Sequence, residues 1–135
     1  MTRLAVCVAL FCTTGLTTGC LEAEDQPVTW SYVYATVIQP NCTSSNCHSE
    51  LASTRGLQFH FKEGAYLMLT GRMCGAEDVP GQPDHNFVVP YEPGRSKVMY
   101  MLRGEETLQM PPDVPLPDVE IGFVERWIAQ GAACD

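Results

Sequence analysis

Positive charge is scarce in this 135-residue sequence, which has 8 Lys and Arg residues against 16 Asp and Glu residues and a formal net charge of −8. Nucleic-acid binding is therefore disfavoured, because neutralising phosphates requires clustered basic side chains. The sequence also lacks an apolar run long enough to span a bilayer as a helix. Because 45% of its residues are hydrophobic and only 18% are charged, it is not typical of a disordered acidic tail. The length favours one compact domain.

The first residues are typical of a secretory signal, because a basic residue precedes an apolar run over residues 4–11 and small residues follow it. Residues 16–20 (LTTGC) resemble a bacterial lipobox, although the leucine stands one place further from the cysteine than usual. We therefore expect a lipoprotein-type signal peptide over residues 1–19, lipidation at Cys20, and an acidic tether over residues 20–29. Ordinary cleavage nearby, with Cys20 as a spare thiol, is the alternative. We expect the exported protein in the periplasm or cell envelope. The residue after Cys20 is not acidic, which favours a lipid anchor in the outer membrane.

Export changes the expected chemistry of the seven cysteines, because an oxidising compartment permits disulfides. Two cysteines would leave with the signal peptide, and Cys20 would carry the lipid. Cys42 and Cys47 belong to a motif of their own. Cys74 and Cys134 remain, and an even remainder in an exported chain predicts a disulfide between them, with two free buried thiols as the alternative.

Residues 30–135 are predicted to form one all-α domain with long loops and no internal repeat. Apolar residues recur at helical spacing in four segments, which are residues 30–39, 63–70, 96–103 and 117–130. Pro40 is expected to end the first helix, and Thr29 and Ser96 are expected to cap the first and third helices. In residues 56–61, apolar and polar residues alternate weakly, a pattern compatible with a short extended segment. Residues 72–94 show no period and should form a long loop.

Two cysteines and a histidine, Cys42, Cys47 and His48, follow the first predicted helix. Covalent haem attachment needs two thiols at one porphyrin edge and a neighbouring imidazole that ligates iron. The usual motif has two residues between the cysteines, whereas this one has four, which are small and polar enough to bulge outward. A Cys42–Cys47 disulfide, with His48 at the surface, is the alternative. Zinc is least favoured, because adjacent Cys47 and His48 would not point at one tetrahedral ion.

A second iron ligand is suggested by Met110, which precedes two prolines. Thioether sulfur is a standard axial ligand of cytochrome iron, and the prolines stiffen the loop and remove two amide donors. An isolated methionine would be better explained as a core residue, but its pairing with the cysteine and histidine motif favours a ligand. Met99 and Met101 fit the apolar pattern of a helix and are expected in the core. The competing ligands are His60, His85, Met73, Met99 and Met101.

The order and spacing of these motifs resemble the bacterial c-type cytochrome domain family over nearly all of residues 30–135. The sequence looks most like single-haem domains of environmental bacteria whose attachment cysteines have four residues between them. The matching segments are residues 37–42 (VIQPNC), 47–48 (CH), 56–57 (GL), 88–90 (VVP), 93–96 (PGRS), 110–112 (MPP) and 127–132 (WIAQGA). The extended segment over residues 72–86 departs from the family pattern.

The resemblance implies a small cytochrome c-like fold, with the N- and C-terminal helices packed around one covalent haem c. It implies that Cys42 and Cys47 are the thioether attachment residues, His48 the proximal iron ligand and Met110 the distal ligand. The expected function is electron transfer by a membrane-tethered carrier rather than catalysis. The acidic charge predicts redox partner proteins with a basic docking face. The alternatives are a small haem peroxidase or gas sensor, and a disulfide-stapled binding module without haem.

Overall fold

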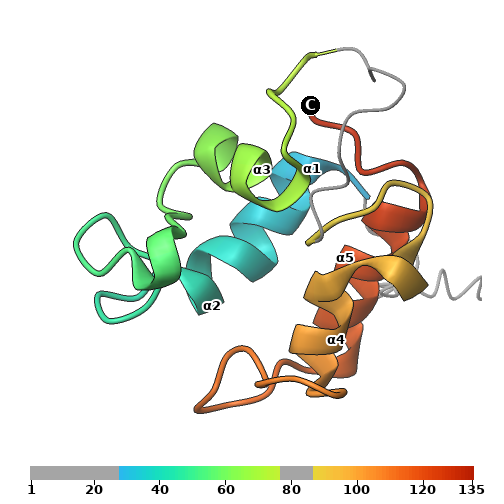
Figure 1. Ribbon diagram of the computed structural model, residues 1–135. Helices are drawn as coiled ribbons and strands as arrows, with labels where there is room; N and C mark the ends of the chain where they lie inside the picture. The colour runs from blue at the N-terminus through green and yellow to red at the C-terminus, as the bar shows by residue number, and fades with distance from the viewer. Residues whose placement is uncertain (1–27, 77–86) are drawn as a thin grey trace, which may run out of the picture.

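The computed structural model describes residues 28–76 and 87–135, and Figure 1 shows how their helices are arranged. The helical elements are α1 (Trp30–Val33), η2 (Tyr34–Ile38), α2 (Gln39–Cys42), η3 (Thr54–Gly56), α3 (Lys62–Thr70), η4 (Pro93–Arg95), α4 (Lys97–Arg103) and α5 (Asp118–Ala129). These two ranges contain no strand, not even at residues 56–61, so the all-α prediction is confirmed for them. None of their helices is long and apolar enough to cross a membrane. The predicted signal peptide, Cys20 and most of the tether lie outside the described residues.

The elements α1, η2 and α2 follow one another without a break and form a single helical segment over residues 30–42. Thr29 caps it as predicted, because its hydroxyl accepts a hydrogen bond from the Tyr32 amide at 3.2 Å. The prediction that Pro40 ends the helix is wrong. The η2 stretch directly before Pro40 is π-helical. The proline therefore does not follow a regular α-helical turn, which is the case in which its ring would clash with a carbonyl of the preceding turn. The segment therefore extends to Cys42.

The other three α-helices lie close to their predicted bounds. Gly71 follows α3 with a φ of 71°, and its amide donates to the Leu67 carbonyl. Gly104 follows α4 in the same left-handed region, with a φ of 68°. Glycine reaches this conformation without a Cβ clash, which is why it ends these helices. Asp118 and Glu120 occupy the first turn of α5, where the helix dipole favours carboxylates.

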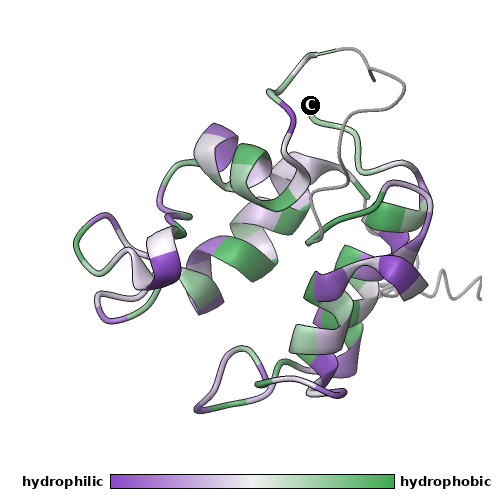
Figure 2. Cartoon of the chain, viewed as in Figure 1, coloured by the Kyte–Doolittle hydropathy of each residue, from purple (hydrophilic) through white to green (hydrophobic). Residues whose placement is uncertain are grey.

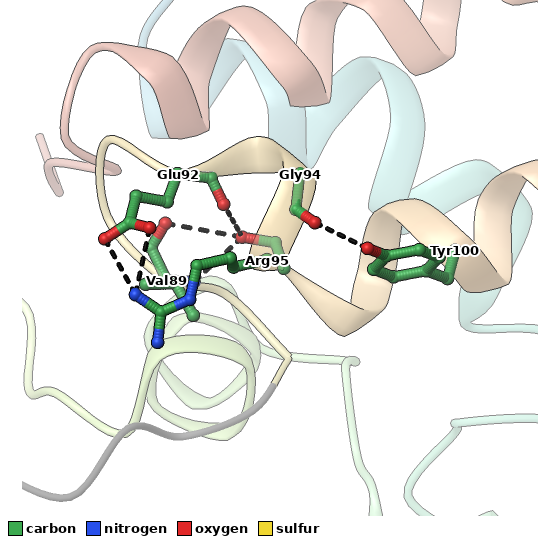
Figure 3. Close-up of polar contacts among 6 residues, drawn as sticks. Val89, Glu92, Gly94, Arg95 and Tyr100 are labelled. Atoms are coloured by element: carbon green, nitrogen blue, oxygen red, sulfur yellow. Dashed lines mark hydrogen bonds and ion pairs between the residues drawn. The ribbon is translucent and has the colours of Figure 1, made fainter.

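Short-range polar contacts hold the segment that leads into α4, as Figure 3 shows. Arg95 pairs with Glu92 at 2.9 Å. Ser96 stands at the start of α4, but its side chain makes no capping hydrogen bond, so its predicted role as a cap is wrong. Its fully buried hydroxyl instead accepts from the Val89 amide at 2.9 Å and donates to the Glu92 carbonyl at 3.0 Å. Ser96 therefore fixes the preceding turn against the start of α4.

Three aromatic side chains fill the contact between the N-terminal helical segment and α5. Trp30 and Trp127 are buried with ring centroids 4.9 Å apart, and Tyr66 of α3 lies against both, at 5.7 and 6.3 Å. Each indole N–H donates to a backbone carbonyl, as buried indoles require. Figure 2 shows apolar residues interrupted by polar ones along α5, as expected for a helix with one buried face. The predicted packing of the two terminal helices is present.

A disulfide joins Cys74, which follows α3, to Cys134, which follows α5, with their Cα atoms 5.3 Å apart. The pairing predicted from the cysteine count is confirmed. The bond ties the segment after α3 to the end of the chain beyond α5, next to the aromatic cluster.

Removing this disulfide is expected to lower the free energy of unfolding by about 4 kcal/mol, because the bond closes a long loop in the unfolded chain. The two cysteines are 60 residues apart in the sequence. The variant to measure is Cys74→Ser/Cys134→Ser, since a single substitution would leave a reactive thiol. Urea unfolding of the double variant against the oxidised wild type gives the difference. An unchanged urea midpoint would contradict the prediction.

Candidate functional site

An apolar cavity of about 340 Å³ lies among the end of the N-terminal helical segment, the loop that follows it, α3, α4 and residues 108–112. Its volume falls within the range of small-molecule binding sites, and it is partly open to solvent. All four side chains predicted to hold a cofactor line it. They are Cys42, Cys47, His48 and Met110. The fold therefore brings together residues that are far apart in the sequence.

A tight loop returns Cys47 and His48 to the end of α2, where Cys42 lies. The Cys47 amide donates to the Ser44 carbonyl at 2.9 Å, and the His48 amide donates to the Cys42 carbonyl at 3.1 Å. Residues 44–46 are exposed, so the spacer projects outward as the sequence predicted. The four-residue spacing therefore leaves both thiols and the imidazole at the same cavity.

Cys42 and Cys47 are free thiols, so the alternative disulfide between them is not formed in this structure. Burial raises the pKa of Cys42 to about 12, and the neighbouring Cys47 adds to this effect. A thiol with so high a pKa is protonated at neutral pH, unlike the thiolates that bind metal ions or act as nucleophiles. The described residues contain no group of three or more His, Cys, Asp and Glu that could hold a metal ion.

Two contacts orient the imidazole of His48. Its Nδ1 lies 3.3 Å from the Leu57 carbonyl oxygen, and its ring packs on that of Phe59 with centroids 4.7 Å apart. The Phe59 amide also donates to the His48 carbonyl at 2.8 Å, which fixes the backbone. When Nδ1 carries the proton and donates to Leu57, Nε2 keeps a free lone pair and can bind a metal.

Two methionines line the cavity, Met110 and Met101. The Met110 amide donates to the Met101 carbonyl at 2.8 Å, which holds the two segments together. Met101 is only half-buried and is not among the buried core residues, so the prediction that it lies in the core is wrong. Val98, Met101 and Leu102 are three and four residues apart, so they share the face of α4 that lines the cavity. Met99, on another face, is buried in the core as predicted.

The other competing ligands do not line the cavity, within the part of the chain that the structure describes. Met73 is 69% exposed. His60 packs against Phe61 with ring centroids 4.1 Å apart and the rings tilted by 51°. His85 lies outside the described residues. Met110 and Met101 are thus the described methionines placed to act as a second ligand.

Sequence reasoning missed Arg55, which belongs to η3 and lines the cavity. It also missed Phe59 and Phe87, whose aromatic side chains form part of the cavity wall. Arg55 directly precedes the Gly56-Leu57 pair that the resemblance singled out, and this proximity is the one signal that pointed toward it. Helical or strand periodicity does not identify residues on an irregular loop as cavity-lining.

No protein-family model, curated protein or solved structure matches this chain. The residues that line the apolar cavity include two thiols, an oriented imidazole and two thioethers.

Proposed function

We propose that this chain is a monohaem c-type cytochrome that passes single electrons between redox partner proteins. The observation that carries the proposal is the arrangement of Cys42, Cys47, His48 and Met110 around one apolar cavity. The first three are joined by a tight loop, whereas Met110 comes from a distant segment. Two thiols, an imidazole and a thioether are the groups that hold a covalently attached haem with histidine and methionine as its axial ligands.

The donor set fits this cofactor in its chemistry and its surroundings. Cys42 and Cys47 would form the two thioether bonds, and His48 would bind iron through Nε2 while Leu57 holds its Nδ1. Met110 would supply the second axial ligand. When bound, the haem supplies the one-electron chemistry of its iron. The largely apolar lining suits a porphyrin, and partial burial of an iron site is one means of tuning its potential.

The surrounding fold supports a carrier by holding the cavity walls in place. The Trp30, Tyr66 and Trp127 cluster packs α1, α3 and α5 together, and the disulfide ties the segment after α3 to the end of the chain. Electron transfer needs such a rigid environment because rearrangement around the iron adds to the barrier. It requires no acid–base residue from the protein.

Export and partner choice form part of the same proposal. The Cys74–Cys134 disulfide is compatible with an oxidising compartment such as the periplasm or cell envelope. Lipidation at Cys20 would tether the carrier to the outer membrane. The net charge of −8 would favour redox partners that present a basic face, because complementary charge increases the rate of encounter.

A spectroscopic redox titration tests this function. Protein produced with cytochrome c maturation machinery is expected to interconvert reversibly between ferric and ferrous forms, with one electron taken up per chain. The ferrous form should bind little carbon monoxide, because a thioether occupies the sixth position. Rapid and complete carbon monoxide binding would contradict the electron carrier and favour a sensor or peroxidase with an open iron.

A further inference from the structure

One side of α3 presents apolar side chains to solvent. Phe61 directly precedes α3 and is 64% exposed, and Leu67 is 43% exposed. Gly64 lies between them at three-residue spacing, and a Cβ added to it would meet the Phe61 Cβ at 3.9 Å, so these three residues form one stripe, the α3 stripe. Leu69, which lines the cavity, is two residues after Leu67 and so points to nearly the opposite side of the helix. The helix α3 therefore separates the α3 stripe from the cavity.

The α3 stripe lies next to the place where the described chain begins. The Trp30 indole N–H donates to the carbonyl of Lys62, the neighbour of Phe61, at 3.2 Å. Lys62 Nζ also donates to the Ser31 hydroxyl at 2.8 Å. Cys42, which lines the cavity, is twelve residues beyond Trp30, and the rise of a helix places it about 18 Å away. Figure 1 shows α3 and the C-terminus at one end of the molecule and the loop between α4 and α5 at the other.

The predicted tether is shorter than the domain is wide. Cys20, the predicted lipidation site, and Val28, where the described chain begins, are eight residues apart. Even fully extended, eight residues reach only about 28 Å. A domain of about 100 residues has a radius of gyration of about 13 Å and is therefore roughly 34 Å across. A lipid on Cys20 thus keeps the side of the domain that carries its first residues next to the bilayer, and the α3 stripe belongs to that side.

We propose that the α3 stripe docks on the lipid bilayer that anchors Cys20. The inference rests on the lipid anchor included in the proposed function. Phe61 and Leu67 insert between the headgroups and the acyl chains, where burying a phenylalanine or leucine side chain shifts a binding equilibrium by about tenfold or more. Because α3 lies between the α3 stripe and the cavity, docking places the cavity on the side of α3 that faces away from the bilayer. Redox partners then reach the carrier from the aqueous compartment.

Apolar burial rather than charge is expected to hold this contact. Lys62 and the exposed Glu63 carry opposite charges beside the α3 stripe, and the net charge of −8 disfavours an anionic surface. Phosphatidylcholine vesicles, whose headgroups carry no net charge, are therefore the probe. The contact should persist when the ionic strength rises from about 0.1 M to about 1 M, because salt screens exposed charges and does not weaken apolar burial.

The test is photolabelling of full-length, lipidated holoprotein in phosphatidylcholine vesicles that contain a lipid with a photoactivatable acyl chain. Peptide mapping should find the label on residues 61–67 of the wild type. Phe61→Ser/Leu67→Ser should lower this labelling about tenfold. The matched control is Leu51→Ser/Val114→Ser, which replaces two other exposed apolar side chains, one between α2 and η3 and one between α4 and α5. This control should leave the labelling of residues 61–67 unchanged.

A gain of contact provides a second test that does not depend on removing side chains. Gly64→Leu adds an apolar side chain to the α3 stripe, and the Phe61 Cβ at 3.9 Å leaves room for the added Cβ. This variant should raise the labelling of residues 61–67. Labelling equal to or below that of the wild type, in a variant whose urea midpoint has not fallen, would contradict the docking.

Haem content and the mass of the peptide that contains Cys20 are measured on the same preparations, which separates the possible failures. If the label lies elsewhere in the wild type, or if Phe61→Ser/Leu67→Ser is labelled like its control, the docking is overturned and the cytochrome proposal stands. An unlipidated Cys20, or a second copy of the chain that covers the α3 stripe, would also overturn the docking. A lipidated chain that is labelled on residues 61–67 but carries no haem would support the docking and overturn the cytochrome proposal.

Discussion

Replacing Cys42 and Cys47 together with alanine is expected to abolish covalent haem attachment, reducing haem that survives acid denaturation to background. Both thiols line the cavity, and neither is used in a disulfide. Each thiol would form one bond to a vinyl group, so either single variant should keep one bond, and the double variant should keep none. Haem staining after denaturing electrophoresis, together with mass spectrometry of the intact chain, measures the loss.

The matched control for this loss is Cys74→Ala/Cys134→Ala, which also removes two cysteines. These residues form the disulfide and do not line the cavity. The control should retain covalent haem even though its free energy of unfolding falls. Acid-resistant haem in the Cys42→Ala/Cys47→Ala variant would show that the attachment residues lie elsewhere.

Replacing Met110 with alanine is expected to remove the sulfur-to-iron bond while covalent haem is retained. The weak absorption near the red end of the ferric spectrum should vanish, and the reduction potential should fall. The fall follows because a soft thioether favours ferrous iron, so its loss favours the ferric state. The ferrous form should then bind carbon monoxide. Optical spectra and a redox titration of the variant give all three results.

Met101→Ala and Met99→Ala are the controls for this assignment. Met101 also lines the cavity and is linked to Met110 by a backbone hydrogen bond, whereas Met99 is buried in the core. Both controls should keep the sulfur-to-iron absorption. If Met101→Ala removes it and Met110→Ala does not, Met101 is the ligand and the assignment of Met110 is wrong. If no methionine variant alters the spectrum, His85 is the next residue to substitute.

Local signals in the sequence predicted most of the helices, because helix formation and termination depend mainly on nearby residues. Thr29 begins the first helix, and Gly71 and Gly104 follow α3 and α4. The error at Pro40 arose because the proline rule assumes regular α-helical hydrogen bonds, whereas this helix widens into a π-helical turn. The error at Ser96 arose because its hydroxyl found partners in a preceding turn.

The candidate site was predictable where its residues are neighbours in the sequence. Cys42, Cys47 and His48 form a recognisable motif, and the small residues between the cysteines allowed the outward bulge to be foreseen. The positions of Met101 and Arg55 were not predictable, because they depend on which helix face and which loop the folded chain turns toward the cavity. A helical apolar pattern marks a residue as inward-facing without telling whether it meets other side chains or a cavity.

The pyridine haemochrome assay on full-length protein, produced with cytochrome c maturation machinery, tests the central claim most directly. This assay measures haem content and reports from band position how many vinyl groups have become thioethers. We predict one haem per chain, with both vinyl groups converted to thioethers. Peptide mapping should place this haem on the segment that contains Cys42 and Cys47. A colourless protein in which Cys42 and Cys47 are bonded to each other would contradict the account.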